Sequence, residues 1–364
     1  MAEMANNYIA FLDLVGTKNF GENAGRHYEN MEAFRRELGR IGDICLKDTD
    51  KIYMFSDCAY VWSDDIDCIA GFLAELRDVL LPRRIYFKAA LVPTDKNWSE
   101  DSTAAEAVRP NPEMNRNLFG VKFGDVNIFE AYMRQERYKG IGIFVSDEAK
   151  KAIGPDRLAE SVYYVENENF EKTGAGRWSL QKYTDLKAVV EDEDSNDYAM
   201  NVAQVVLDNY LSANTQSHKY SRHYIPLLTT MLRSYAVTKK KGAGEEELLA
   251  WDEKSGLFAG KAPWMFNTIL KMARAARELD VLGLDILCLV VADIAFGRET
   301  AITPYDRKSI VKTLNSYACI NNKYSRDIHS IPNVFLDGKR REEFIRLYKE
   351  ILTDDNPLKK ILKE

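Results

Sequence analysis

The sequence predicts an α+β domain followed by an all-α domain, and two observations support this prediction. Up to about residue 190, short β-rich runs alternate with segments whose apolar residues recur at helical spacing. After the acidic run EDEDSND at 191–197, the remaining segments have helical patterns. We therefore expect a first domain over 1–190, a solvated acidic linker at 191–197, and a helical domain over 198–364 that serves regulation or assembly.

The elements of the first domain follow from local patterns, in chain order. Runs rich in β-branched and aromatic residues predict three strands, at 8–15, 51–62 and 84–92. Between them, apolar residues on one side with charges opposite predict two helices, at 28–46 and at 66–81, the second stopped by Pro82. A polar loop at 93–117 is too long for a simple turn, which is typical of a functional or mobile segment.

The same kinds of pattern predict the elements of the rest of the chain. A helix is expected around 124–138, followed by a strand at 140–146 and by two β-like pieces, SVYYVEN and RWSLQKY. Helical patterns then dominate, in YAMNVAQVVLDNYLSA, YIPLLTTMLRSYAV, PWMFNTILKMARAARELDVLG, LDILCLVVADIAFG and REEFIRLYKEIL. The piece KKKGAGEEE has the composition of an exposed connection between helices.

Composition excludes several classes of function. The formal charge of −6 gives no global attraction to nucleic acid, so such a partner is possible only through a local patch and is not indicated. No apolar run approaches the ~20 residues of a membrane span, and the first residues lack a signal core. Five cysteines without a CxxC pair indicate reduced thiols, and four scattered histidines disfavour a histidine-rich metal site. We expect a soluble cytoplasmic protein.

Two aspartates stand inside apolar runs that otherwise predict buried strands. They are Asp13 in YIAFLDLVGTKNF and Asp57 in KIYMFSDCAYVW. A buried charge costs several kcal/mol unless something compensates it. Two carboxylates on neighbouring central strands can share a divalent cation, which prefers oxygen ligands and commonly binds substrate phosphates as well. The alternative is that Asp13 begins a turn at DLVG and that Asp57 caps a bulge.

Four stretches in order resemble class III nucleotidyl cyclases, most of all the bacterial antiphage, Pycsar-type pyrimidine nucleotide cyclases. YIAFLDLVGTKNF resembles the first metal-binding strand of the family, and YMFSDCAYVW resembles the second. RIYFKAALV stands where the family has its next strand, and FGVKFGDVNIFEAYMRQE followed by GIGIFVS resembles its later helix and strand. The resemblance covers residues 8–146, which is under half of the chain.

The resemblance implies a fold, an activity and a set of site residues. The fold would be a ferredoxin-like, palm-type cyclase domain with an antiparallel sheet and helices. Asp13 and Asp57 would hold two Mg²⁺ or Mn²⁺ ions, with the backbone of Leu14 beside them, and Lys18 and Lys88 would contact the nucleotide. The implied reaction converts a nucleoside triphosphate to a 3′,5′-cyclic nucleotide and pyrophosphate in a homodimer, with a possible place in antiphage signalling.

The sequence also departs from the family at the expected phosphate contacts. KAALVPTDKNW lacks the glycine-bearing hairpin that follows the third strand in the family. Asn127 corresponds to an asparagine that holds ribose, but the position four residues on, where the family has arginine, is Ala131. Arg134 shares a helix face with Asn127 and is the first substitute, with Arg137 as a second. Lys139, in YKG, is the remaining candidate catalytic cation.

These departures keep two other classes of function open. One is a cyclase-fold nucleotide sensor without turnover, which the missing hairpin and arginine favour and the paired aspartates disfavour. The other is a partner-binding subunit of a nucleic-acid defence complex that docks through its helical half.

Overall fold

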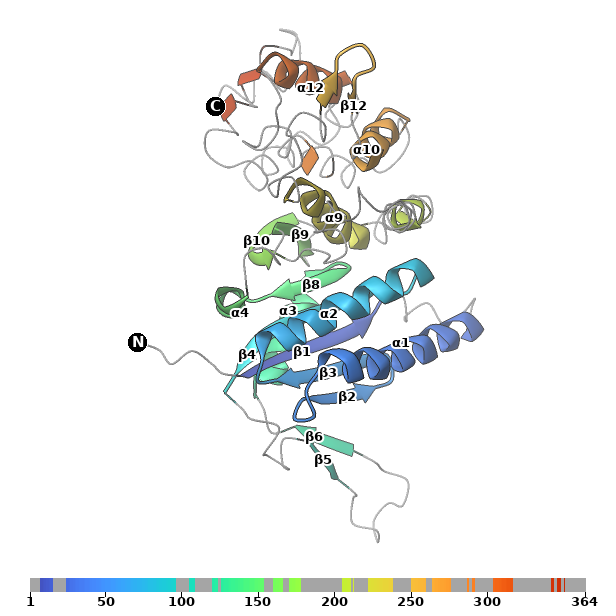
Figure 1. Ribbon diagram of the computed structural model, residues 1–364, viewed down its shortest axis with the longest axis vertical. Helices are drawn as coiled ribbons and strands as arrows, with labels where there is room; N and C mark the ends of the chain where they lie inside the picture. The colour runs from blue at the N-terminus through green and yellow to red at the C-terminus, as the bar shows by residue number, and fades with distance from the viewer. Residues whose placement is uncertain are drawn as a thin grey trace. The chain divides into compact units, whose positions relative to one another are not determined.

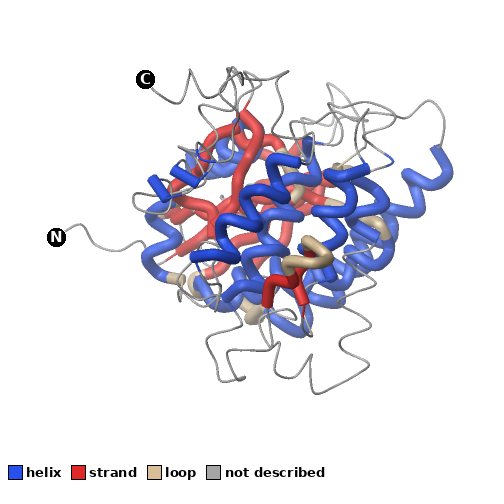
Figure 2. The backbone as a smooth tube through the Cα atoms, turned by 90° about the horizontal axis from the view of Figure 1, so that it is seen from above, coloured by secondary structure: helices blue, strands red, loops and turns tan. Residues whose placement is uncertain are grey.

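The computed structural model describes the chain in ranges separated by gaps. Figure 2 colours the described helices, strands and loops and leaves the other residues grey. The described residues are 7–15, 24–95, 105–108, 120–123, 126–153, 160–165, 170–177, 205–210, 212, 222–237, 250–259, 264–275, 287, 290–291, 304–316, 342–343, 346–347 and 350. Contacts within the chain define two compact units, residues 1–158 with 174–178 and residues 159–173 with 179–364.

The first unit is built on a five-stranded sheet in the order β2–β3–β1–β4–β8. Its strands are β1 (Asn7–Leu14), β2 (Lys51–Phe55), β3 (Cys58–Ser63), β4 (Phe87–Thr94) and β8 (Gly142–Val145). Neighbours are antiparallel except β4 and β8, which run parallel. Along the chain, β1–α1–β2 and β3–α2–β4 form two interleaved split βαβ units, which is the ferredoxin-like arrangement. The predicted α+β class is confirmed.

Helices cover both faces of this sheet because β1 is apolar on both. Helices α1 (Ala24–Cys45) and α2 (Ile66–Leu80) lie together on one face (Figure 1). There Leu12 belongs to a core shared with Phe34 of α1 and Phe72 of α2. Helix α3 (Val126–Arg137) covers the other face, where Phe11 packs in a smaller core with Ala131. Successive strand residues point to opposite faces, so Asp13 lies on the face of α3.

The predicted single strand at 51–62 is wrong in one respect that matters for the site. The structure has a tight hairpin there, with Ser56 and Asp57 in the turn between β2 and β3. Phe55 pairs with Cys58 directly across the turn. Ser56 has φ of 52°, a left-handed conformation uncommon outside glycine, asparagine and aspartate. Asp57 is therefore a turn residue at the tip of the hairpin and not a strand residue.

The other elements of the first unit are short. Helix α2 begins after Asp65, whose carboxylate accepts hydrogen bonds from the backbone N–H groups of Asp67 and Cys68. It ends at Leu80, and Pro82 lies in the 3₁₀ turn η1 (Leu81–Arg83) that follows. The segment predicted as a loop at 93–117 contains the end of β4 and one strand of an antiparallel pair. The remaining elements are β5 (Ala105–Val108), β6 (Gly120–Phe123), β7 (Tyr138–Lys139) and α4 (Asp147–Ala152).

The described part of the later chain is mainly helical and also contains strands. Its elements are β9 (Glu160–Val165), β10 (Phe170–Arg177), η3 (Arg222–Tyr224), α9 (Ile225–Val237), β11 (Ala250–Asp252), β12 (Leu257–Ala259), α10 (Trp264–Ala275) and α12 (Pro304–Ser316). The hairpin β11–β12 lies within the range predicted to be all-α. The side-chain amide of Asn267 in α10 bonds both backbone groups of Phe258 in β12, which anchors the hairpin.

The predicted linker at 191–197 lies outside the described residues, as does KKKGAGEEE. The boundary near 190 therefore stays a prediction. None of the helices in the described part of the chain has both the length and the apolar content needed to cross a membrane.

Candidate metal centre

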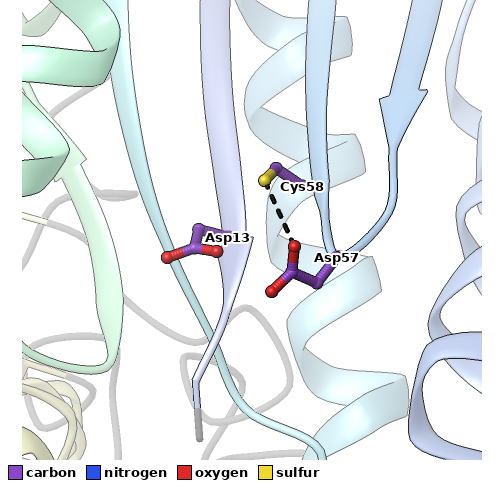
Figure 3. A group of neighbouring side chains, drawn as sticks. All are labelled: Asp13, Asp57 and Cys58. Atoms are coloured by element: carbon purple, nitrogen blue, oxygen red, sulfur yellow. Dashed lines mark hydrogen bonds between the residues drawn. The ribbon is translucent and has the colours of Figure 1, made fainter. Parts of the chain in front are cut away.

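The sheet brings Asp13 and Asp57 to one place although they are distant in sequence. Asp13 is the penultimate residue of β1 and pairs across the sheet with Cys58, the first residue of β3. The backbone N–H of Leu14 donates to the carbonyl of Asp57 at 3.0 Å, which ties the end of β1 to the hairpin turn. Potential ligand atoms of Asp13, Asp57 and Cys58 all lie within 4.8 Å of one another (Figure 3).

The negative charge of Asp13 is only partly neutralised by its neighbours. Its Oδ2 lies 3.2 Å from Nζ of Lys88 and accepts a hydrogen bond of 3.3 Å from the amide of Gln135. Burial is the largest influence on this carboxyl and raises its pKa, the Lys88 ammonium opposes the rise, and the charge of Asp57 adds to it. The net pKa is raised, so the surroundings of Asp13 disfavour its charged form and a further cation would relieve that cost.

Cys58 is unsuited to bind a hard cation. Its thiol donates to Oδ1 of Asp57 at 3.5 Å (Figure 3). Burial, and then the charges of Asp13 and Asp57, raise the pKa of this thiol to about 12. Cys58 therefore remains a protonated thiol, whereas Mg²⁺ takes oxygen ligands.

The oxygen donors around Asp13 fit a divalent cation. The two carboxylates supply negative charge, and Gln135 of α3 adds a side chain that is 1% exposed. Its Nε2 donates to Asp13, while its Oε1 is buried and has no hydrogen-bond donor among the described residues. A buried oxygen without a partner costs about 1–3 kcal/mol, so it is a candidate ligand or acceptor for an incoming group. Asp13, Asp57 and Gln135 are therefore the residues that would hold Mg²⁺ or Mn²⁺.

Lys88 lies inside this acidic cluster. It is directly opposite Asp13 in the pairing of β1 with β4, and its ammonium also contacts Oε1 of Glu136 at 3.0 Å. In the structure Lys88 neutralises two carboxylates, and its contact with nucleotide stays a prediction. Gln135 and Glu136 were not predicted as site residues. The useful signal was that Gln135 lies one turn after Ala131, a small apolar residue on the sheet side of the helix.

Of the catalytic residues predicted on and after α3, Arg134 is the one whose side chain is described, and its ion pair is with Glu130 and not with Asp13. Arg134 makes an i,i+4 ion pair with Glu130 at 3.1 Å, on a different side of the helix from Gln135. Asn127 and Lys139 lie in α3 and β7, but their side chains and that of Arg137 are outside the described set. Lys18 also lies outside the described residues.

Comparisons with known proteins give little further information. The sequence matches no protein-family model, and a search of curated proteins finds no match. Among solved structures, one similar chain is the guanylate cyclase domain of RhGC from Catenaria anguillulae, in complex with GTP. It is 12% identical, with a TM-score of 0.31 over 47% of this chain and 92% of that chain. A similarity this low does not establish a shared function.

Proposed function

We propose that this chain is a metal-dependent nucleotidyl cyclase that converts a nucleoside triphosphate to a 3′,5′-cyclic nucleotide and pyrophosphate. One observation carries the proposal: the end of β1 and the β2–β3 turn bring the carboxylates of Asp13 and Asp57 together, beside a buried amide oxygen that has no donor in the described part of the chain. Two acidic side chains from neighbouring elements of an α+β sheet are a common way to bind the divalent ions that accompany a triphosphate.

The roles of the residues follow from their charge. Asp13 and Asp57 bind the Mg²⁺ or Mn²⁺ ions, with the backbone of Leu14 beside them. Bound divalent ions lower the pKa of a coordinated hydroxyl and neutralise phosphate charge. In the reaction the ribose 3′-hydroxyl loses its proton to solvent, its oxygen forms a bond to the α-phosphorus, and the bond from that phosphorus to pyrophosphate breaks. Lys18 and Lys88 contact the phosphates.

The proposed phosphate and ribose contacts lie on and after helix α3. Asn127 orients the ribose, and Arg134 and Lys139 stabilise the charge that develops on the phosphates. Arg134 is partly exposed and forms an ion pair with Glu130, so this exposed pair must break before Arg134 reaches a substrate. Such pairs contribute at most about 1 kcal/mol, which does not prevent that movement.

A homodimer and a role in antiphage signalling complete the proposal. Phe129 and Met133, one turn apart on α3, are 65% and 51% exposed. Large apolar side chains exposed next to each other on one helix are typical of a surface that another chain covers. We propose a second copy of this chain as that partner. The antiphage role rests on the sequence resemblance alone.

A cyclase-fold nucleotide sensor is the second candidate, and one observation favours it. Lys88 places a cation next to Asp13, as a bound metal would, and so partly satisfies the site without any ligand. A sensor would bind nucleotide with a divalent ion and release it unchanged.

One experiment separates these two functions. Purified full-length protein is incubated with Mn²⁺ and each of the four common nucleoside triphosphates, and products are identified by mass spectrometry. The cyclase proposal requires a cyclic nucleotide and pyrophosphate in equal amounts, and no product from the Asp57→Asn variant. Metal-dependent nucleotide binding without product supports the sensor. If the Asp57→Asn variant binds nucleotide and Mn²⁺ as tightly as the native protein, the metal site is assigned wrongly.

A further inference from the structure

The pairing of the strands fixes the position of Lys88, and its side chain is mostly buried. It lies directly opposite Asp13 in the β1–β4 register, and its side chain is 13% exposed. Its ammonium is 3.2 Å from Asp13 and 3.0 Å from Glu136, so one cation is shared between two carboxylates. A partly buried pair of this kind interacts more strongly than an exposed one, since less water screens it.

The same ammonium competes with any metal ion for Asp13. Oδ2 of Asp13 already accepts from both Lys88 and Gln135. A divalent ion bound at this carboxylate would lie close to the Lys88 ammonium, and the two positive charges would repel each other. Lys88 must therefore leave Asp13 before a divalent ion binds well there.

The cost of moving Lys88 depends on what accompanies the metal. When a free divalent ion binds, Glu136 is the one described carboxylate that stays paired with Lys88. When the ion arrives with a triphosphate, the ammonium can contact phosphate oxygens, which bind lysine well. The same movement is thus unfavourable with metal alone and favourable with metal and triphosphate together.

We propose that Lys88 is a resident counter-ion that couples metal binding at Asp13 to triphosphate binding. It holds the carboxylate in the absence of ligand, disfavours free divalent ions, and becomes a phosphate contact when metal and triphosphate bind together. This inference rests on the metal site of the proposed function but not on turnover. Lys88 is a specificity-determining residue for the metal–triphosphate complex over the free ion.

The chain offers a matched control in the same unit. Lys47 also bridges two carboxylates, those of Asp64 and Asp65, at 3.0 and 3.2 Å. It is 46% exposed and belongs to the loop that follows α1. Lys47→Met therefore removes the same charge and the same kind of contact outside the metal centre.

The test measures binding and not activity. Free Mn²⁺ is counted by electron paramagnetic resonance during titration of the full chain, first with Mn²⁺ alone and then with Mn²⁺ and inorganic triphosphate. Lys88→Met should bind Mn²⁺ alone at least about tenfold more tightly, because a unit charge within about 4 Å of a partly buried carboxylate changes its cation affinity by more than that factor. The gain in Mn²⁺ affinity caused by triphosphate should fall by at least about tenfold.

The other variants should leave both quantities near those of the native protein. Lys88→Arg keeps the charge and should retain the competition, and Lys47→Met should have no effect on either. If Lys88→Met leaves Mn²⁺ affinity unchanged while Asp13→Asn abolishes binding, the counter-ion proposal is wrong and the metal site stands. If Lys88→Met behaves as expected but no triphosphate is cyclised, the cyclase proposal fails and the counter-ion proposal stands. Absence of Mn²⁺ binding in both the native protein and Lys88→Met overturns both.

A second variant decides the question if Lys88→Met does not fold. Glu136→Gln leaves Lys88 with Asp13 as its carboxylate partner, so the native competition should strengthen and Mn²⁺ alone should bind more weakly. Glu130→Gln is its control, since Glu130 is also on α3 and also pairs with a basic residue, Arg134. Unchanged or tighter Mn²⁺ binding by Glu136→Gln, or equal weakening by both variants, contradicts the proposal.

Discussion

Two buried or partly buried carboxylates of the first unit, Glu37 and Asp13, have opposite surroundings. Glu37 of α1 is 2% exposed and accepts from Arg40 at 2.6 Å and from Arg83 at 2.8 Å, with Arg36 at 3.4 Å. The hydrogen bond from Arg40 is the largest cause of a lowered pKa at Glu37, against the effect of burial. Asp13 has one lysine, one amide and a second carboxylate nearby, and its pKa is raised.

The difference shows how a structural carboxylate is told from a functional one. Three guanidinium groups around Glu37 satisfy its charge within the protein, so it needs no ligand. The cost of burying the charged carboxylate of Asp13 is not offset by its neighbours. Residues with such surroundings are common at sites that bind a charged ligand. Burial alone does not distinguish the two residues, whereas the balance of charge around them does.

The largest expected effect comes from neutralising Asp13. Asp13→Asn should lower cyclase turnover by at least about 10²-fold, the scale for losing one preorganised electrostatic contact. It should also raise the free energy of unfolding without ligand by about 1 kcal/mol, since active-site charges are often held at a cost to stability. Turnover and chemical denaturation measure the two effects, with the exposed Asp43→Asn on α1 as control. A large loss of stability in Asp13→Asn would show that its charge is structural, like that of Glu37.

A second prediction concerns Arg134. The sequence predicts that it contacts phosphate in place of the arginine that the family has at the position of Ala131. Arg134→Ala should lower turnover by about 10²-fold and leave nucleotide affinity nearly unchanged, because the contact strengthens as charge develops. Arg35→Ala is the control, since Arg35 forms a similar exposed ion pair on α1 with Glu32. Kinetics with each variant measure kcat and KM separately. If Arg134→Ala is silent while Arg137→Ala or Lys139→Ala is inactive, another cation takes this role.

The sequence predicted the element pattern around Asp13 better than the site itself. The continuous apolar run of β1 and the helical spacing of α1 and α2 are local properties, and those elements agree with the structure within a few residues. Placing Asp57 in a strand failed because Ser56-Asp57 lacks the Asn-Gly type of signal that marks a two-residue hairpin. The positive φ of Ser56 is imposed by the surrounding pairing of β2 with β3.

The partners of the two carboxylates were harder to predict because the contacts join elements that are distant in the sequence. Lys88 meets Asp13 through the register of β1 with β4, and Gln135 meets it through the packing of α3 on the sheet. Arg83 reaches Glu37 from a turn 46 residues away in sequence. No local spacing encodes these contacts, so the sequence identified Asp13 as unusual but not what surrounds it.

A third prediction tests the structural side of the comparison. Glu37→Gln should lower the free energy of unfolding at neutral pH by about 1–3 kcal/mol, the range for hydrogen bonds to charged groups, because the guanidinium groups lose their shared acceptor. Metal and nucleotide binding should change little. Urea denaturation gives the free energy, and Glu32→Gln, an exposed residue on the same helix, should cost less than about 0.5 kcal/mol. Equal effects of the two substitutions would mean that the burial of Glu37 adds nothing to the free energy of unfolding.

The smallest expected effect is the pH dependence of that stabilisation. The folded pKa of Glu37 lies below its ordinary value, so the unfolded chain binds the proton more readily between the two values. The contribution of Glu37 is therefore complete above the unfolded pKa and is lost as the pH falls through the folded pKa.

The difference in unfolding free energy between native protein and Glu37→Gln should consequently stay constant from neutral pH to about pH 5 and shrink below it. Urea denaturation of both proteins at a series of pH values measures this difference, and comparing the two cancels the other carboxylates. Glu32→Gln should show no such trend. A difference that stays constant to the acid limit of folding would mean that the arginines hold Glu37 by shape and packing, and the contrast with Asp13 would then not be one of charge.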